Sequence, residues 1–554
     1  MSTKSLLLGL TIAGLIVGCG HPKDEAITQH PAAQTETDLA VTEELAQPAA
    51  VPPVQMKMQA ASSYGMPAPM SLRARIAPHE ISIDRENYDQ IDANTIKLTE
   101  ENPVSTFSID VDTGAYSNIR RILNQGRLPR HDAVRIEEMI NYFSYNDPTP
   151  SDNKPFLVSS EIAPTPWNKD THLLRLALKT EQIQIQDLPP SNLVFLLDVS
   201  GSMSAPDKLP LLKRSLNLLI PKLRAEDKVS IVVYAGASGV VLEPTNGDKH
   251  AVISQALEKL SAGGSTHGSA GIKLAYAKAK ESFIKDGINR VILATDGDFN
   301  VGTINHEALI NLIEKKREQG ISLTTLGFGQ GNYNDKLSEQ LADHGNGNHA
   351  YIDNLLEAQK VLVEEMGGTL NTVAKDVKIQ VEFNPANVRE YRLIGYENRK
   401  IKREDFNNDK VDAGEIGAGH SVVALYEIAL TDSQHGLIDQ LRYQSAKAQT
   451  VAKGDELAFV KLRYKAPNGN KSQLMTFALN KAGIEKSLSA SSNNLRFSAA
   501  VAAFGQKLRG GKYLSDFDYA DISELARDSR GEDNKGYRSA FLQLVALADS
   551  LDKG

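Results

Sequence analysis

Between residues 191 and 370 the sequence alternates short apolar runs with amphipathic stretches, and this alternation constrains the fold most strongly. The apolar runs NLVFLL, KVSIVVYA, GVVLE, RVILAT, ISLTTLGFG and HAYID have the length and composition of buried strands. Between the first two runs, the stretch 207–220 places Leu209, Leu212 and Leu216 on one helical face. The pattern predicts an α/β fold built on a doubly wound, mostly parallel sheet.

The segments on either side of this α/β region are predicted to be rich in β-structure. Residues 81–190 contain a strand and two helices separated at Pro129, followed by two further strands, and residues 371–480 return to strands. A Pro-Asn-Gly turn at 467–469 predicts a hairpin, and helices are expected between 481 and 554. Because strands occur on both sides of the α/β region, we expect that region to be a domain inserted into one β-sandwich.

The overall composition is that of a globular protein. The chain has 554 residues, of which 41% are hydrophobic and 23% are charged, and its length is greater than one domain usually needs. The formal net charge is -8, and no basic tail or stripe is present. These features exclude nucleic acid as an expected partner.

Cys19 is the only cysteine in the chain. A single cysteine allows neither an intramolecular disulfide nor a zinc site built from cysteines. It follows Lys4 and an apolar run between Leu6 and Val17. This run is too short for a membrane-spanning helix, which needs about 20 apolar residues. Residues 1–19 instead resemble a bacterial lipoprotein signal peptide.

The resemblance to a lipoprotein signal implies cleavage before Cys19 and attachment of acyl chains, such as palmitate, to its thiol and its new amino group. The protein would then be anchored in a lipid bilayer. Gly20 stands where retention in the inner membrane would require Asp, which favours the outer membrane of the cell envelope. The lipobox residues are Ile16, Val17, Gly18 and Cys19.

Residues 20–80 differ in composition from the rest of the chain. They mix Pro, Ala, Gln and Thr and show neither helical nor alternating periodicity. The segment is therefore predicted to be a disordered tether, which would span about 40–45 Å on average.

Polar side chains follow the apolar strands of the α/β region in three loops. Asp198, Ser200 and Ser202 follow the first strand, Thr266 lies in GGSTHGSAG before a helix, and Asp296 follows a later strand. Ligands of open parallel sheets bind beyond the carboxyl ends of the strands. Oxygen donors that include two carboxylates suit a hard ion, Mg²⁺ or Mn²⁺. The alternative is that these residues only cap helices and form turns.

These three loops, in this order, resemble the von Willebrand factor A domain and its metal-ion-dependent adhesion site. The resemblance implies hydroxyl ligands, aspartates that bind the ion directly or through water, and an open coordination position. An acidic side chain of a partner protein would fill that position. His267 is expected to be a bystander. The metal ligands implied by the resemblance are Asp198, Ser200, Ser202, Thr266 and Asp296.

The segments outside the α/β region carry a second resemblance. The stretches NPVSTFSIDVDTGAYSNIRRILNQG, VRIEEMINYF, YRLIGYENR and DAGEIGAGHSVVALYEI are similar to those of bacterial von Willebrand factor A lipoproteins. The similarity extends from about Tyr88 to Leu551. It implies an architecture rather than an activity.

An enzymatic alternative rests on FSIDVDTG, in which Asp110 and Asp112 follow a strand. The stretch is superficially similar to the aspartyl nucleophile loop of haloacid dehalogenase phosphatases, so a phosphotransferase is a remote alternative. Gly114 stands where that family has Thr or Val. The common hydrolase, nucleotide-binding and zinc-protease motifs are absent from the sequence.

Two further groups of residues were considered as metal ligands. His344 and His349 are expected to lie in a polar loop rather than to bind metal. The stretch DFNNDKVDAGE is at most a weak calcium loop, because the glycine and the glutamate of an EF-hand are missing. A solvated hairpin loop is the preferred interpretation. The candidate calcium ligands are Asp405, Asn407, Asp409 and Asp412.

The sequence therefore predicts a lipid-anchored, monomeric binding protein of the cell envelope that is not an enzyme. It would recognise an acidic side chain of a partner protein through Mg²⁺ or Mn²⁺. The alternative is a structural envelope scaffold whose metal only stabilises the fold.

Overall fold

A computed structural model describes residues 85–151, 154–266, 268–297, 299, 305–433, 436, 438 and 454–553. The predicted signal peptide and tether, including Cys19, lie outside the described residues, as does His267. None of the helices in the described part is both long enough and apolar enough to cross a membrane.

The α/β region forms a six-stranded sheet with the order β10-β9-β8-β5-β6-β7. All neighbouring strands are parallel except β7, which pairs with β6 in the antiparallel direction. The strand β5 lies inside the sheet between β8 and β6, so the loop that follows β5 lies beside the ends of both neighbouring strands. The strands are β5 (Ser191–Asp198), β6 (Lys228–Tyr234), β7 (Ser238–Asn246), β8 (Ile288–Thr295), β9 (Ser322–Phe328) and β10 (His349–Ile352).

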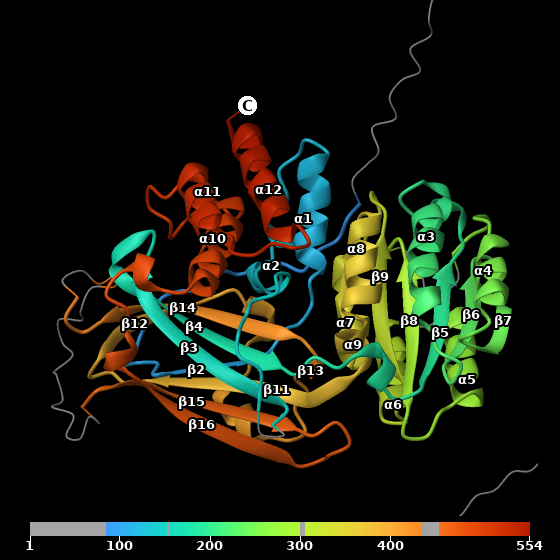
Figure 1. Cartoon of the computed structure of the whole chain (residues 1–554), viewed down its shortest axis with the longest axis horizontal. Coiled ribbons are helices and arrows are strands. Elements are labelled where there is room, and N and C mark those ends of the chain that lie inside the picture. Colours follow the sequence, from blue (N-terminus) through green and yellow to red (C-terminus); the bar gives the residue numbers. More distant parts are fainter. Residues whose placement is uncertain are drawn as a thin grey trace, which may run out of the picture. The chain divides into compact units, whose positions relative to one another are not determined.

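Helices cover both faces of this sheet (Figure 1). Alternate side chains of β5 face opposite sides, so Phe195 packs with α3, α4 and α8, whereas Leu196 packs with α5, α6 and α7. Both faces are therefore buried, which explains the continuous apolar runs. The helices are α3 (Leu209–Leu219), α4 (His250–Glu258), α5 (Gly268–Glu281), α6 (His306–Arg317), α7 (Asp335–His344) and α8 (Leu355–Gln359), followed by a π-helical turn (Lys360–Glu364) and α9 (Met366–Leu370).

Strands from both sides of the α/β domain build two further sheets. The first has the order β1-β12-β14-β4-β3, and the second has the order β13-β11-β15-β16, with β2 also paired to β11. The pairs β4–β14 and β2–β11 join segments that precede and follow the α/β domain. The strands are β1 (Lys97–Leu98), β2 (Val104–Ser108), β3 (Phe156–Thr165), β4 (Asn168–Thr180), β11 (Thr372–Phe383), β12 (Val388–Ile394), β13 (Gly414–Gly417), β14 (Ser421–Leu430), β15 (Glu456–Lys465) and β16 (Ser472–Asn480).

A layer of helices covers the outer face of the β4–β14 sheet (Figure 1). Leu173 and Ala177 of β4 pack against these helices, whereas Leu174 and Leu176 point into the core between the two sheets. Successive side chains of β4 point to opposite faces of the sheet, so the sheet separates two apolar cores. The helices are α1 (Gly114–Asn124), α2 (Ile136–Asn141), α10 (Asn493–Leu508), α11 (Tyr519–Asp528) and α12 (Tyr537–Asp552).

The predicted fold class is confirmed by the sheet order and by the strands that flank the insertion. The predicted polar-loop position of the two histidines is wrong, because His344 is the last residue of α7 and His349 is the first residue of β10. Only four residues connect α7 to β10, so the helix ends at one histidine and the strand begins at the other. His349 is buried, and its ring nitrogens contact the hydroxyls of Thr325 and Tyr333 at 2.9 and 2.6 Å.

Candidate metal centre

The first loop of the candidate site begins where β5 ends. Asp198 is completely buried, and its Oδ1 accepts a hydrogen bond from the backbone N–H of Ser200 at 2.8 Å. Its Oδ2 is buried without a hydrogen-bond partner among the described residues. The hydroxyl oxygens of Ser200 and Ser202 lie 3.0 Å apart. Alternate side chains of the loop therefore meet, as the D-x-S-x-S spacing predicts.

The second loop is joined to the first by backbone hydrogen bonds. The N–H of Gly201 donates to the carbonyl of Gly264 at 2.9 Å, and the N–H of Gly263 donates to the carbonyl of Val199 at 2.8 Å. Gly264 has φ +80°, a conformation that favours glycine. Thr266 follows two residues later and is half-buried. The structure thus holds the segment that carries Thr266 beside the loop that carries the serines.

The third loop follows β8, the strand next to β5. Asp296 is completely buried, and its Oδ2 accepts a hydrogen bond from the ammonium of Lys208 at 2.8 Å. The same ammonium donates to Oδ1 of Asn332 at 3.1 Å. Gly297 has φ +97°, and a Cβ at this position would lie 2.2 Å from the backbone nitrogen of Asn334. The start of the third loop, at Gly297, is therefore packed tightly against residues 332–334.

The two aspartates differ in their electrostatic surroundings. Burial raises the pKa of Asp198 to about 6, and the negative charge of Asp296 adds to this effect, whereas interactions with Ser200 and with the hydroxyl of Tyr234 oppose it. Burial also disfavours the charged form of Asp296, but the hydrogen bond and charge of Lys208 outweigh it and hold the pKa of Asp296 below its ordinary value. Asp198 therefore lacks a cation of its own, whereas Asp296 has one.

These residues fit a bound divalent cation. A buried carboxylate oxygen without a partner is costly, and Oδ2 of Asp198 is such an atom. A hydroxyl pair lies on the same loop, and a second carboxylate lies at the end of the adjacent strand. Oxygen donors of this kind suit Mg²⁺ or Mn²⁺.

Two residues of this region were not identified from the sequence. Lys208 lies in the turn before α3, and Asn332 lies in the loop after β9. A Cβ at Gly329 would lie 2.3 Å from Cγ of Lys208, so the lysine stem passes closely over that glycine. Lys208 follows the D-x-S-x-S motif by only a few residues, but in sequence it resembles any surface lysine.

Three family models match the chain. The von Willebrand factor type A domain matches residues 192–365, a von Willebrand factor model matches residues 82–175, and the C-terminal model of the uncharacterized protein YfbK matches residues 368–551. The uncharacterized protein YfbK of Escherichia coli strain K12 is 48% identical over 489 residues, which cover 86% of this chain and 83% of that protein. This chain belongs to the YfbK family. It contains a von Willebrand factor type A domain.

Members of other groups share less with this YfbK-family chain. Inter-alpha-trypsin inhibitor heavy chain H3 of Homo sapiens is 24% identical over 274 residues, which cover 46% of this chain and 30% of that protein. The solved structure of a von Willebrand factor type A protein from Catenulispora acidiphila is 15% identical, covers 69% of this chain and 88% of that one, and gives a TM-score of 0.38.

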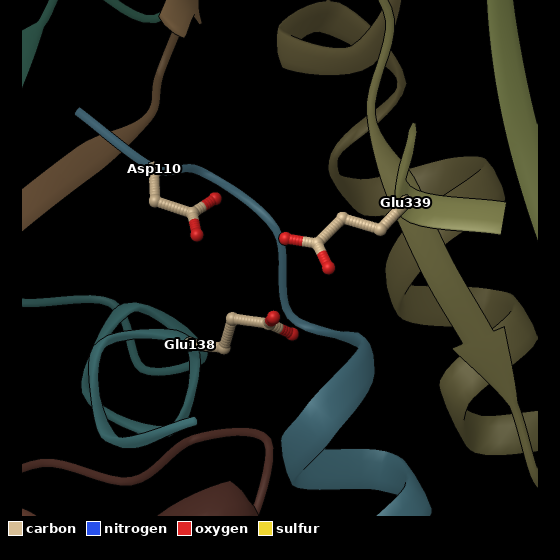
Figure 2. A group of neighbouring side chains, drawn as sticks. All are labelled: Asp110, Glu138 and Glu339. Carbon is tan, nitrogen blue, oxygen red and sulfur yellow. The ribbon is translucent and has the colours of Figure 1, made fainter. Parts of the chain in front are cut away.

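A second group of carboxylates lies outside the von Willebrand A loops. Asp110, Glu138 and Glu339 point toward one another, as Figure 2 shows, and one oxygen of each lies within 4.8 Å of the others. All three residues are buried. They come from the segment after β2, from α2 and from α7, so the group joins the α/β domain to the preceding segment.

Two arginines pair with this second group, but they also pair with Asp112, Asp335 and Asp343, so carboxylates outnumber cations here. Burial raises the pKa of Glu339 to about 7. Nε of Arg399 lies 3.1 Å from Oδ2 of Asp110, and Nη2 of Arg135 lies 2.7 Å from Oε2 of Glu339. Oε2 of Glu138 accepts a hydrogen bond from the backbone N–H of Ala115 at 2.7 Å. The carboxylate oxygens are thus held by protein donors, and the group acts as a buried ion network.

The same network bears on the phosphotransferase alternative. Asp110 and Asp112 are each 3% exposed, and both lie within ion-pair distance of Arg399. Oδ1 of Asp112 also accepts a hydrogen bond from the backbone N–H of His349 at 2.8 Å. A phosphoryl acceptor must be reached by its substrate, and the geometry presents neither aspartate to one.

The side chains of three candidate calcium residues, Asn407, Asp409 and Asp412, have protein partners, and the four candidates divide into separate groups. Asp409 accepts hydrogen bonds from Ser472 and Arg463, and Arg463 also donates to Asn407 at 3.2 Å. Asp412 pairs with Arg317 and lies in a group of carboxylates with Asp376 and Glu415. Among residues 405–412, which the structure describes throughout, Asp405 and Asp409 do not share a group of converging carboxylate oxygens with Asp412.

Proposed function

We propose that this protein is a lipid-anchored binding protein of the cell envelope that captures a partner protein through a divalent cation. The observation that carries the proposal is the buried, unpartnered Oδ2 of Asp198 beside the hydroxyl pair of Ser200 and Ser202. Membership of a family with a von Willebrand factor type A domain supports the same conclusion.

The proposed ion is Mg²⁺ or Mn²⁺. Asp198, Ser200, Ser202 and Thr266 would hold it, together with Asp296. When bound, the ion would supply a positive charge at the edge of the sheet for an acidic side chain of the partner. The pull of that charge is local, because two carboxylates already balance a divalent ion. Binding, rather than catalysis, is the proposed activity.

Lys208 has a supporting role in this proposal. Its ammonium is bonded to Oδ2 of Asp296 and to Oδ1 of Asn332, so it fixes the third loop without any metal. For Asp296, this arrangement argues against a metal that is needed only to keep the carboxylate folded into place. A buried carboxylate that already has a cationic partner does not need a second cation to remain folded.

The proposed location follows from the first 19 residues. The lipobox ending at Cys19 supports anchoring through acyl chains, and Gly20 supports the outer membrane. The proposed state is a monomer.

The experiment is affinity capture from envelope extract, with the full chain as bait in Mg²⁺ or in chelator. We expect a partner to be captured in Mg²⁺ and lost in chelator, while circular dichroism of the bait is unchanged. Capture that is equal in both buffers would contradict the cation-dependent function. Loss of folded structure in chelator would instead favour the scaffold.

A further inference from the structure

Residues 85–88, which we call the strap, precede β1 and pair with the loop that connects β9 to α7. The N–H of Arg85 donates to the carbonyl of Gly331 at 2.9 Å, and the N–H of Asn87 donates to the carbonyl of Tyr333 at 3.0 Å. The strap lies outside residues 192–365, which match the von Willebrand factor type A domain. A segment far away in the sequence thus adds to a loop of that domain.

Glu86 links the β9–α7 loop to α1, which also lies outside the von Willebrand A domain. Its side chain is buried, and its Oε1 accepts a hydrogen bond from the backbone N–H of Gly331 at 3.1 Å. Its Oε2 lies 2.8 Å from Nη2 of Arg121 in α1 and accepts a hydrogen bond from the hydroxyl of Tyr88 at 2.7 Å. The two oxygens of one carboxylate therefore connect the loop to the helix.

The strap provides the backbone hydrogen bonds in the middle of the loop. Within the described part of the chain, every backbone hydrogen bond of residues 330–333 runs to the strap. Tyr333 also anchors the loop through its side chain, which is buried and donates from its hydroxyl to Oδ1 of Asp335 at 2.9 Å. Loss of the strap's hydrogen bonds would therefore loosen the loop backbone, while the tyrosine side chain still anchors one end of the loop.

The same loop packs against the candidate metal centre. A Cβ on Gly297 would lie 2.2 Å from a backbone nitrogen of this loop, so the two backbones are in close contact. Oδ1 of Asn332 accepts a hydrogen bond from the ammonium of Lys208, which also donates to Oδ2 of Asp296. The β9–α7 loop thus contacts the strap through its backbone and contacts the segment that carries Asp296 through Gly297 and Lys208.

We propose that the strap positions Asp296 for a divalent cation by holding the β9–α7 loop against Gly297. Glu86 is the positioning residue that connects this support to α1. The inference rests on the proposed function, because it concerns the same cation. Groups that orient metal ligands without touching the ion typically change metal affinity about 10- to 100-fold when they are lost. A segment outside the von Willebrand A domain therefore sets the affinity of that domain for its ion.

Proline substitutions in the strap test this role. Proline has no backbone N–H, so Arg85→Pro removes the hydrogen bond to Gly331 and Asn87→Pro removes the hydrogen bond to Tyr333. Both side chains are exposed, and Arg85→Ala and Asn87→Ala are matched controls that keep the N–H. Mn²⁺ binding to the full chain is measured by electron paramagnetic resonance. We expect each proline variant to bind Mn²⁺ about tenfold more weakly than its alanine control.

The unfolding midpoint in chelator separates positioning from a purely structural role. We expect each proline variant to unfold close to its alanine control, because the strap is at the edge of the fold and Tyr333 stays buried. A purely structural strap would instead lower the midpoint and leave the Mn²⁺ affinity of the folded protein unchanged. Circular dichroism checks that each variant is folded.

Hydrogen exchange in chelator tests the strap without any metal. The N–H of Gly297 donates to Oγ1 of Thr295 at 3.1 Å, so its protection does not depend on a hydrogen bond to the strap. We expect this amide to exchange about fivefold faster in the proline variants than in the alanine controls, because the loosened loop no longer holds Gly297.

Two results would overturn the inference. The first is equal Mn²⁺ affinity of the folded proline variants and their alanine controls when the parent protein binds Mn²⁺. The second is unchanged exchange at Gly297. A parent protein that binds no Mn²⁺ would contradict the proposed function instead, and the exchange at Gly297 would then decide by itself whether the strap positions this loop.

Discussion

The ammonium nitrogen of Lys208 lies 2.8 Å from Oδ2 of Asp296, and both side chains are almost fully buried. Asp198, at the end of the neighbouring strand, has no such partner for its Oδ2. The two carboxylates of the candidate metal centre are therefore not equivalent. The charge of Asp296 is compensated by Lys208, whereas Asp198 has no cationic partner among the described residues.

Lys208→Met should increase the affinity for Mg²⁺ about five- to thirtyfold, because a positive charge next to the ion is removed. In chelator the same variant should lose roughly 3 kcal/mol of unfolding free energy, since Asp296 remains as a buried charge without its cationic partner. Mg²⁺ titration and chemical denaturation measure these effects. Lys249→Met is the control, because the exposed side chain of Lys249 contacts the exposed Asp248 and its loss should change stability by less than about 1 kcal/mol. Weaker Mg²⁺ binding by Lys208→Met would contradict this account.

The raised pKa of Asp198, about 6, predicts a pH dependence. The folded protein holds this proton more tightly than the unfolded chain, whose value is near 3.8, so stability in chelator should fall as the pH rises through this interval. The expected contribution is on the order of 2–3 kcal/mol. Denaturation of the parent and of Asp198→Asn at pH 4 and pH 7 isolates it, because other buried carboxylates titrate in both proteins. Parallel pH profiles of the two proteins would show that Asp198 is not responsible.

The fold was largely predictable, because the apolar runs of 191–370 leave few alternatives to a parallel sheet covered on both faces. The ends of those runs also placed Asp198 and Asp296 correctly at the carboxyl edge of the sheet. The strand β13 was missed, since Gly414–Gly417 is short and half of its residues are glycine.

Contacts between distant segments were not predictable. Lys208 meets Asp296 only because the loop after β9 folds over the lysine stem. Arg399 reaches Asp110 across 289 positions of sequence. Nothing in the sequence around FSIDVDTG indicates that its two aspartates share ion pairs with an arginine from so far away.

Replacing Asp405 and Asp409 together with Asn should change neither metal content nor partner binding. The structure already gives Asp409 protein donors, Ser472 and Arg463. Thermal unfolding with and without Ca²⁺ should therefore give the same midpoint for the parent protein. A midpoint that Ca²⁺ raises in the parent but not in the double variant would establish a calcium site here.

Cys19→Ser should yield an uncleaved or soluble precursor, because acylation of this thiol is the proposed membrane attachment. Metabolic labelling with palmitate checks the prediction. The parent protein should take up the label, and the variant should not. An unlabelled parent would remove the basis for a lipoprotein.

The central claim is that Asp296 and Asp198 hold a divalent cation, and Mn²⁺ binding measured by electron paramagnetic resonance tests it most directly. Because Asp296→Ala alone would leave Lys208 buried without its partner, the matched variant is Asp296→Ala combined with Lys208→Met. The parent should bind one Mn²⁺ in competition with Mg²⁺, and the folded double variant should bind Mn²⁺ about a hundredfold more weakly than the single variant Lys208→Met, since one of the two carboxylates is gone. Equal Mn²⁺ affinity of Lys208→Met and the double variant would contradict the proposed metal centre.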